Sequence, residues 1–179
     1  MNARARWATV VAMSGMFAVA AAGATATGND GRNGSHHFAT SLKGFEEVPA
    51  ISTRAHGSFR AQTTGDGLEW RLRYSGIEGG AVLQAHIHFG QKGVNGGVSA
   101  FLCSSLPNAP AGVQACPENA ADLRGTIGPE NIVGPAAQGI GPGELDELVR
   151  AMRSGVAYAN VHSTTYPSGE IRGQVHHKH

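Results

Sequence analysis

Short stretches in which apolar and polar residues alternate follow one another along most of the chain, separated by Gly-rich turns. Alternation with a period of two places successive side chains on opposite faces of a β-strand. In the clearest case, Leu68, Trp70, Leu72 and Tyr74 form an apolar face and the residues between them are charged. The pattern predicts strands at 37–42, 57–62, 68–74, 82–89, 98–102, 156–162 and 170–175. We therefore expect an all-β domain, an antiparallel β-sandwich or barrel that is Greek-key-like and has about seven to eight strands.

One segment has a helical period instead. Leu145, Leu148, Val149 and Met152 recur at helical spacing. Acidic residues lie in the first turn and arginines in the last, and Gly155 follows as a stop signal. We expect one α-helix near residues 142–154, packed on the sheet. The alternative is that its apolar stripe binds a partner.

The first residues have the order of parts of a secretory signal peptide. Arg4 and Arg6 precede an apolar run and then a cluster of small residues, with cleavage plausible after Ala22, Ala24 or Ala26. The alternative, an uncleaved membrane anchor, is less well supported because the run is short for a bilayer span. We expect a signal peptide at 1–26 and a flexible linker at 27–35, and we expect the mature protein to be secreted or periplasmic.

The charge of the exported part excludes some partners. Without the two leader arginines, the 14 basic residues fall to 12 against 13 acidic ones, a formal charge of −1. No run of Lys or Arg occurs, so the sequence indicates no nucleic acid as a partner. No second apolar segment is long enough to span a membrane after cleavage.

Both cysteines, Cys103 and Cys116, lie in the exported part. An even count in an oxidising compartment favours a disulfide. The alternative is a reduced metal-binding pair, but the spacing matches no thiolate motif.

Three histidines suggest a metal site. His86 and His88 share one face of a predicted strand, and His162 ends another predicted strand. Three imidazoles that meet in space would form a site for copper or zinc with one open coordination position. Glu170 is a candidate for the fourth ligand or for a second-sphere partner of an imidazole. The alternatives are that the histidines serve the fold by bonding main-chain carbonyls and that Glu170 pairs with arginines.

The other candidates carry less chemistry. His56 is expected on the surface, and the terminal histidines, at 36–37 and 176–179, are expected on mobile ends where no geometry is fixed. If the last two predicted strands are neighbours, one face with Tyr158, Asn160 and His162 and one face with Glu170, Arg172 and Gln174 would form a polar ladder, for which a ligand-binding surface is the alternative. In that ladder Arg172 would bridge carboxylate and carbonyl groups. Glu46 and Glu47 are adjacent, so they would diverge on a strand end rather than pair.

Four ordered motifs resemble a known family. They are FATSLKG at 38–44 with EEVP at 46–49, AHIHFG at 85–90 with GVNG at 93–96, YANVHS at 158–163, and YPSGEIRGQ at 166–174. Together they resemble the CHRD (chordin-type) domain family, in particular a secreted bacterial member, over about residues 38–175. The sequence departs from the family where Ala159 and Ser163 replace the usual Val and Thr, and the cysteine-bearing loop looks like a local elaboration.

The resemblance implies an extracytoplasmic all-β domain, which we place at residues 36–176 with a His-rich tail at 177–179. In animals the domain is associated with a secreted antagonist of growth-factor signalling, and the family supplies no established catalytic residue. The leading hypothesis is a secreted binding protein that holds copper or zinc at His86, His88 and His162. The alternatives are an extracytoplasmic protein-interaction or envelope module and, ranked last, a metal-dependent redox or hydrolytic enzyme, for which no base or substrate pocket is identified.

Overall fold

The computed structural model describes residues 35–178, so the expected signal peptide and nearly all of the expected linker lie outside the described residues. The strands are β1 (His37–Lys43), β2 (His56–Thr64), β3 (Gly67–Ser75), β4 (Val82–Phe89), β5 (Gly97–Ser104), β6 (Ala121–Ile127), β7 (Ala157–Ser163), β8 (Ile171–Gln174) and β9 (His176–Lys178). The helices are the α-helix α1 (Leu145–Arg153) and the 3₁₀ turns η1 (Gly44–Glu46), η2 (Pro129–Asn131) and η3 (Ala136–Gln138). Within residues 35–178, no helix is both long enough and apolar enough to cross a bilayer.

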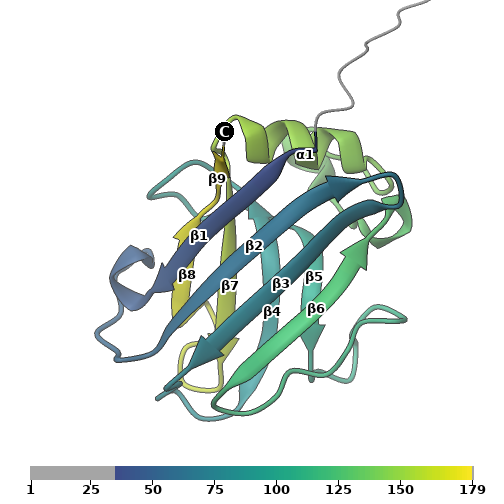
Figure 1. Ribbon diagram of the computed structural model, residues 1–179. Coiled ribbons are helices and arrows are strands. Elements are labelled where there is room, and N and C mark those ends of the chain that lie inside the picture. Colours follow the sequence, from purple (N-terminus) through teal and green to yellow (C-terminus); the bar gives the residue numbers. More distant parts are fainter. Residues whose placement is uncertain (1–34, 179) are drawn as a thin grey trace, which may run out of the picture. The chain divides into compact units, whose positions relative to one another are not determined.

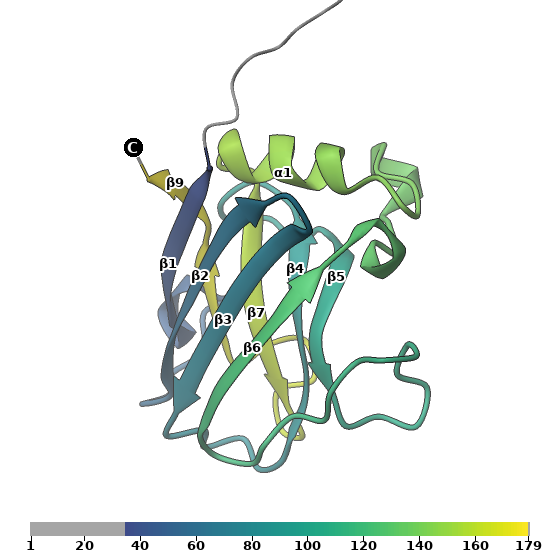
Figure 2. The same cartoon turned by 45° about the vertical axis from the view of Figure 1, so that its right-hand side comes forward.

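The strands form one antiparallel sheet that curls into a nearly closed barrel (Figures 1 and 2). Their order is β5-β4-β7-β8-β1-β2-β3-β6, and β9 pairs with β1 beside this path. Consecutive strands β1, β2 and β3 form a meander, whereas the chain crosses to the other layer before β4 and crosses back before β6. The predicted all-β antiparallel class with one helix is confirmed.

The barrel interior is filled by the apolar faces that the alternation predicted. Leu68 and Leu72 are fully buried, and Trp70 and Tyr74 are nearly so. The helix α1 lies across one end of the barrel, where Leu148 and Met152 are fully buried (Figure 2). Burial of a side chain of this size stabilises the fold by roughly 1.5–3 kcal/mol. The α-helix begins later than residue 142 because Gly143 has a φ of 87°, which makes the preceding residues a turn.

The structure contains two strands that the sequence analysis did not predict. In β6, Leu123 and Ile127 face the core, while Gly125 lies opposite Trp70. A Cβ at Gly125 would lie 2.9 Å from the indole ring, so glycine is required there and interrupts the apolar alternation. Strand β9 pairs with β1 from His37↔Lys178 to Ala39↔His176, so residues 177 and 178, assigned to a tail, belong to the sheet.

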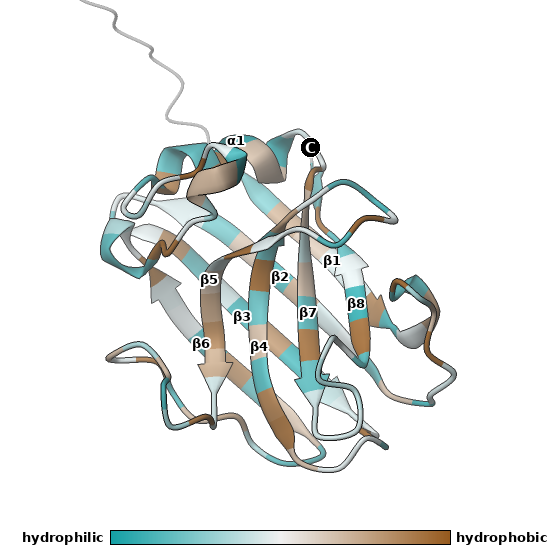
Figure 3. Ribbon diagram, turned by 180° about the vertical axis from the view of Figure 1, so that it is seen from behind, coloured by the Kyte–Doolittle hydropathy of each residue, from teal (hydrophilic) through white to brown (hydrophobic). Residues whose placement is uncertain are grey.

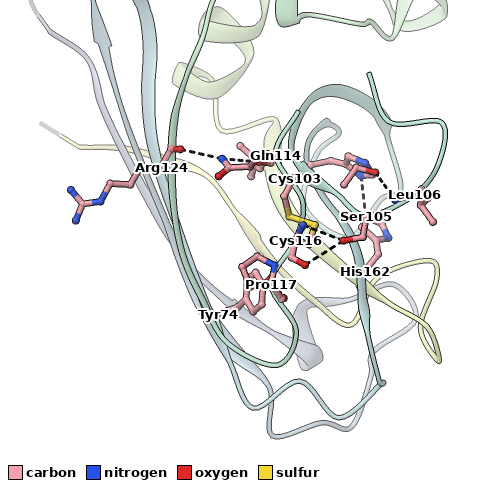
Figure 4. The surroundings of a disulfide bond; sticks show 12 residues. Tyr74, Cys103, Ser105, Leu106, Gln114, Cys116, Pro117, Arg124 and His162 are labelled. Carbon is pink, nitrogen blue, oxygen red and sulfur yellow. Dashed lines mark hydrogen bonds between the residues drawn. A yellow bond between two sulfur atoms is a disulfide. The ribbon is translucent and has the colours of Figure 1, made fainter. Parts of the chain in front are cut away.

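The seam between the two barrel edges, β5 and β6, is closed by a loop rather than by strand pairing. Cys103 on β5 and Cys116 in this loop form the predicted disulfide, with their Cα atoms 5.1 Å apart (Figure 4). The side-chain amide of Gln114 donates to the carbonyls of Leu102 on β5 (3.4 Å) and Arg124 on β6 (3.1 Å). One glutamine side chain thus bridges the gap that a strand ladder would otherwise close.

Candidate metal centre

The three histidines lie on the outer face of the barrel, on adjacent strands. Inward-facing Ile87 and Val161 are fully buried in the core, so their neighbours on β4 and β7 face away from it. Nevertheless His86, His88 and His162 are only 2%, 7% and 5% exposed. The β4–β5 and β7–β8 loops pass over this face (Figure 3). The cluster is therefore a second, polar interior between strands and loops.

The pairing of β4 with β7 brings the imidazoles together. His86 lies opposite Asn160, and Gln84 lies opposite His162, so His86 and His162 are diagonal neighbours across the ladder. The Nδ1 atom of His86 lies 3.2 Å from the Nε2 atom of His162. One nitrogen from each of the three histidines lies within 4.8 Å of the others. The convergence predicted from the sequence is thus present, in a cluster that could hold a metal ion.

Main-chain carbonyls from the two covering loops fix the protonation of two rings. His88 donates from Nδ1 to the carbonyl of Gly96, and His162 donates from Nδ1 to the carbonyl of Pro167, each at 3.0 Å. A carbonyl oxygen only accepts, so both Nδ1 atoms carry the proton and both Nε2 atoms carry a lone pair. The Nε2 atom of His88 is buried and has no hydrogen-bond partner among the described residues, and the same is true of Nε2 of His86.

Burial keeps the three imidazoles neutral. Burial, together with the neighbouring His162 and His88, lowers the pKa of His86 to about 2. It also lowers the pKa values of His88 and His162 to about 4, although their carbonyl partners act in the opposite direction. Neutral imidazole is the form that binds a metal, so the cluster offers nitrogen lone pairs without first losing protons to solution.

The geometry suits a tetrahedral ion. Two nitrogens at the usual zinc bond length of about 2.0–2.1 Å from one ion lie roughly 3.3–3.4 Å apart in tetrahedral geometry. The separation of 3.2 Å between Nδ1 of His86 and Nε2 of His162 is close to this value, so an ion would replace the hydrogen bond between them, with the His86 proton moved to Nε2. The third nitrogen has to approach by at most about 1.5 Å to complete a site of three nitrogen donors, a set that zinc and copper both accept.

Two aromatic rings hold two of the histidines in place. Phe101 meets the His86 ring edge to face, with centroids 4.4 Å apart, and Tyr158 stacks on His88 at 4.7 Å with the planes only 4° apart. The hydroxyl of Tyr158 accepts from the backbone N–H of Gly96, in the same loop that supplies the carbonyl to His88. Strand, ring and loop therefore position His88 together.

Beside the histidines lies a buried ion pair of which the sequence analysis identified only one half. Arg172 donates from Nε to Glu47 at 2.7 Å, from Nη1 to the Val94 carbonyl at 3.3 Å and from Nη2 to Asn95 at 2.5 Å. The predicted bridging by Arg172 is thus observed. The expectation that the segment around Glu47 ends a strand is wrong, because the chain turns through η1 and folds Glu47 back over β8. Burial raises the pKa of Glu47 to about 7, although the Arg172 guanidinium pulls it down.

Glu170 binds loops rather than imidazoles. Its Oε1 accepts from the Thr53 hydroxyl at 2.9 Å and from the Glu78 backbone N–H at 2.8 Å, and its Oε2 accepts from the Gly79 backbone N–H at 3.1 Å. The ligand atoms that lie within 4.8 Å of one another belong to the three histidines, and Glu170 is not among them. Among the described residues it also forms no ion pair with an arginine, the other role considered for it.

The other histidines within residues 35–178 are separate from the cluster. His56 is an exposed residue whose ring lies against the Arg54 carbonyl and the Ser75 hydroxyl, as expected for a surface position. His36 lies 3.3 Å from His177 through Nδ1 and Nε2. This pair has a defined geometry, because β9 is paired with β1, and it is not the mobile end that the sequence suggested.

Fold and site together define a small antiparallel barrel with a buried cluster of three neutral histidines beneath its loops. Residues 38–175 match the family model of the CHRD domain, and the chain belongs to this family. Comparisons with curated proteins and with solved structures gave no match.

Proposed function

We propose that this CHRD-domain protein is exported and that it binds one zinc or copper ion through His86, His88 and His162. The observation that carries the proposal is the buried, unpartnered Nε2 of His88, whose lone pair is fixed by the bond from Nδ1 to Gly96. A buried nitrogen without a partner costs free energy, and a bound ion would remove that cost. Hydrogen bonding of the second imidazole nitrogen to a main-chain oxygen is also usual in metal sites.

The fourth coordination position would belong to water or a small anion. Both carboxylate oxygens of Glu170 are already occupied by donors from other loops. The ion would lie beneath two loops, so exchange of large ligands is disfavoured. This supports a binding or structural role for the ion, rather than turnover of a substrate.

Export is supported by several features. The residues at 1–26 have the order of parts of a signal peptide, a disulfide joins Cys103 to Cys116, and the family to which the chain belongs is extracellular. We propose that the leader is removed and that the domain acts in the periplasm or outside the cell.

A second candidate is an interaction or envelope module in which the histidines hold the fold. It is favoured by the same two carbonyl bonds, because they attach the covering loops to the sheet whether or not an ion is present. The two candidates differ in their response to metal, which makes them separable.

The test is equilibrium dialysis of the full chain against zinc and, separately, copper, with a competing chelator that strips two-histidine sites such as His36–His177. We expect one ion to be retained per chain. His88→Ala and His162→Ala should lose it, and His56→Ala, which removes a surface imidazole, should keep it. Thermal unfolding of each variant shows whether it is folded. If a folded His88→Ala variant retains as much metal as the unaltered chain, the metal-binding proposal fails and the interaction or envelope module remains.

A further inference from the structure

A row of three arginines crosses the barrel face formed by β1, β2, β3 and β6, which is turned toward the viewer in Figure 1. Arg60 on β2 lies directly opposite Arg71 on β3, and Arg71 lies directly opposite Arg124 on β6. Like charges in directly opposite positions destabilise a sheet. The row is not apparent in the sequence, because the three arginines are distant in the chain and belong to no run of basic residues.

One internal carboxylate shows how the row binds an anion. Asp122 accepts from Nε of Arg71 at 2.6 Å and also from its Nη2, and it accepts from Nε of Arg73 at 3.2 Å. Arg124 Nε lies 4.0 Å away from the same carboxylate. Arg60, in contrast, is exposed and has no acidic partner within residues 35–178. The row thus retains positive charge at the end away from Asp122.

A chain of hollows follows these cations across the molecule. A shallow groove of about 850 Å³ is lined by Arg60, Arg71, Arg124 and Lys178. A second hollow of about 410 Å³ shares Arg60 and Lys178 with the first and adds Lys43. His176 lies in both this second hollow and a third of about 650 Å³, which is also lined by Arg150 and Arg153. Each hollow thus shares at least one lining residue with the next, so their basic residues are neighbours on the surface.

The charge of this face is opposite to that of the whole domain. The outward positions on β1, β2, β3 and β6 and on the adjoining β9 include six basic residues and two acidic ones, which are Lys43, Arg60, Arg71, Arg73, Arg124 and Lys178, and Glu69 and Asp122. The face thus has a formal charge of +4, whereas the mature chain as a whole has −1. Charge separated in this way attracts an anionic partner to one side of the protein.

The surroundings of the arginines favour one class of polyanion. The large hydrophobic residues that are exposed in residues 35–178 are Phe45, Val94 and Val133, and none lies on this face. Two aromatic residues, Phe38 and Trp70, line the floor of the groove, but they are only 2% and 7% exposed. The face therefore exposes no apolar side chain that could enter a membrane and no aromatic ring on which nucleic-acid bases could stack. The planar fork of arginine matches carboxylate and sulfate groups, and a groove over several strands suits an extended chain.

We propose that this arginine groove binds a linear acidic polysaccharide through its carboxylate or sulfate groups. Arg60 and Arg124 contact the polymer, Arg71 remains partly engaged with Asp122, and Lys178 extends the path toward α1. The proposal is independent of the metal centre, which lies on β4 and β7 in the other layer of the barrel.

The test measures binding of the full chain to an oligogalacturonate of defined length, which carries carboxylates, and to dextran sulfate, which carries sulfates. Neutral dextran and a single-stranded DNA oligonucleotide are the comparison ligands. We expect at least one acidic glycan to bind, more weakly as salt rises, and neutral dextran not to bind. Arg60→Ala and Arg124→Ala should each weaken binding about tenfold.

Arg54→Ala is the matched control, since Arg54 is exposed, carries the same charge and lies outside the three hollows. It should bind like the unaltered chain. Thermal unfolding of all variants guards against loss of the fold. The proposal is overturned if neither acidic glycan binds at low salt, if Arg54→Ala loses as much affinity as Arg60→Ala, or if the DNA binds more tightly than the glycans.

Discussion

Each histidine of the cluster uses its two ring nitrogens differently, and this division decides what protons do to the protein. In His88 and His162 one nitrogen is committed to a loop carbonyl, so a second proton can only go to the buried Nε2. Sequence alternation was sufficient to predict that His86 and His88 share a face. It could not predict the loop carbonyls, because Gly96 and Pro167 act through backbone atoms that any residue possesses.

The metal-free protein should lose stability in mild acid. Histidines of the unfolded chain protonate near pH 6.5, whereas His88 and His162 in the fold do so near 4, so the unfolded state binds more protons between these values. The free energy of unfolding therefore falls as the pH falls from about 6.5 to about 4, by up to about 1.4 kcal/mol per pH unit for each histidine.

Glu47 changes the pH dependence of stability in the opposite direction, by less than the two histidines together. Its pKa is raised from 4.5 to about 7, so its contribution to stability is lost as the pH rises through that range. Urea unfolding across this pH range measures the sum. His162→Ala should flatten the slope and His56→Ala should not. A slope that is the same in all three proteins would contradict the assigned cause.

Removal of the guanidinium that neutralises Glu47 should be costly. Arg172→Met leaves a carboxylate buried without its cation, and breaking a buried pair in this way costs about 3–5 kcal/mol. Urea unfolding at about pH 8 measures the loss, because Glu47 of the unaltered chain, with its pKa of about 7, is then ionised. Adding Glu47→Gln to Arg172→Met should recover part of it, because the unpaired charge is then gone. A double variant that is less stable than the single one would refute this explanation.

At the scale of elements, the strands with regular alternation were predictable and the strands interrupted by special requirements were not. β3 alternates without exception and was predicted nearly to its ends. β6 was missed because the Trp70 indole requires a glycine at position 125, which interrupts the apolar alternation. β9 was missed because the polar residues His176, His177 and Lys178 resemble a tail. The position of Glu47 depends on how the β1–β2 connection folds back, a long-range event with no local signature.

The seam between β5 and β6 should open first, because isolated backbone bonds and side chains hold it instead of a continuous ladder. Gln114→Ala removes both bridging bonds, and each is worth about 1 kcal/mol. Hydrogen exchange of the β5 and β6 amides should become faster, while that of β1 and β2 stays unchanged. Gln91→Ala, at an exposed loop position, is the control. Unchanged exchange at the seam would show that the disulfide and the core suffice to close it.

For the whole molecule, the fold class, the helix, the disulfide and the histidine cluster could be predicted from sequence, because each depends on a local pattern or a simple count. The two polar networks on opposite layers could not. The arginine row needs the register of three strands, and the Glu47–Arg172 pair joins residues far apart in the chain. Such features depend on which strands become neighbours, and alternation does not determine this.

Metal should stabilise the whole barrel if the proposed site is correct. An ion that binds only the folded state adds about 2.7 kcal/mol when its free concentration is 100 times Kd. The melting temperature of the full chain should therefore rise with zinc or copper, and that of a folded His88→Ala variant should not. Differential scanning calorimetry measures both. An equal rise in the variant would place the bound ion elsewhere.

The pairing of His37 with Lys178 has a consequence for engineering, because it brings the first and last strands of the domain side by side. A short peptide can join these neighbouring ends, and new termini can then be opened in an exposed connection such as the Gly65-Asp66 turn without removing a strand. For the same reason, the barrel can be spliced into a surface loop of a carrier protein as a self-contained insert.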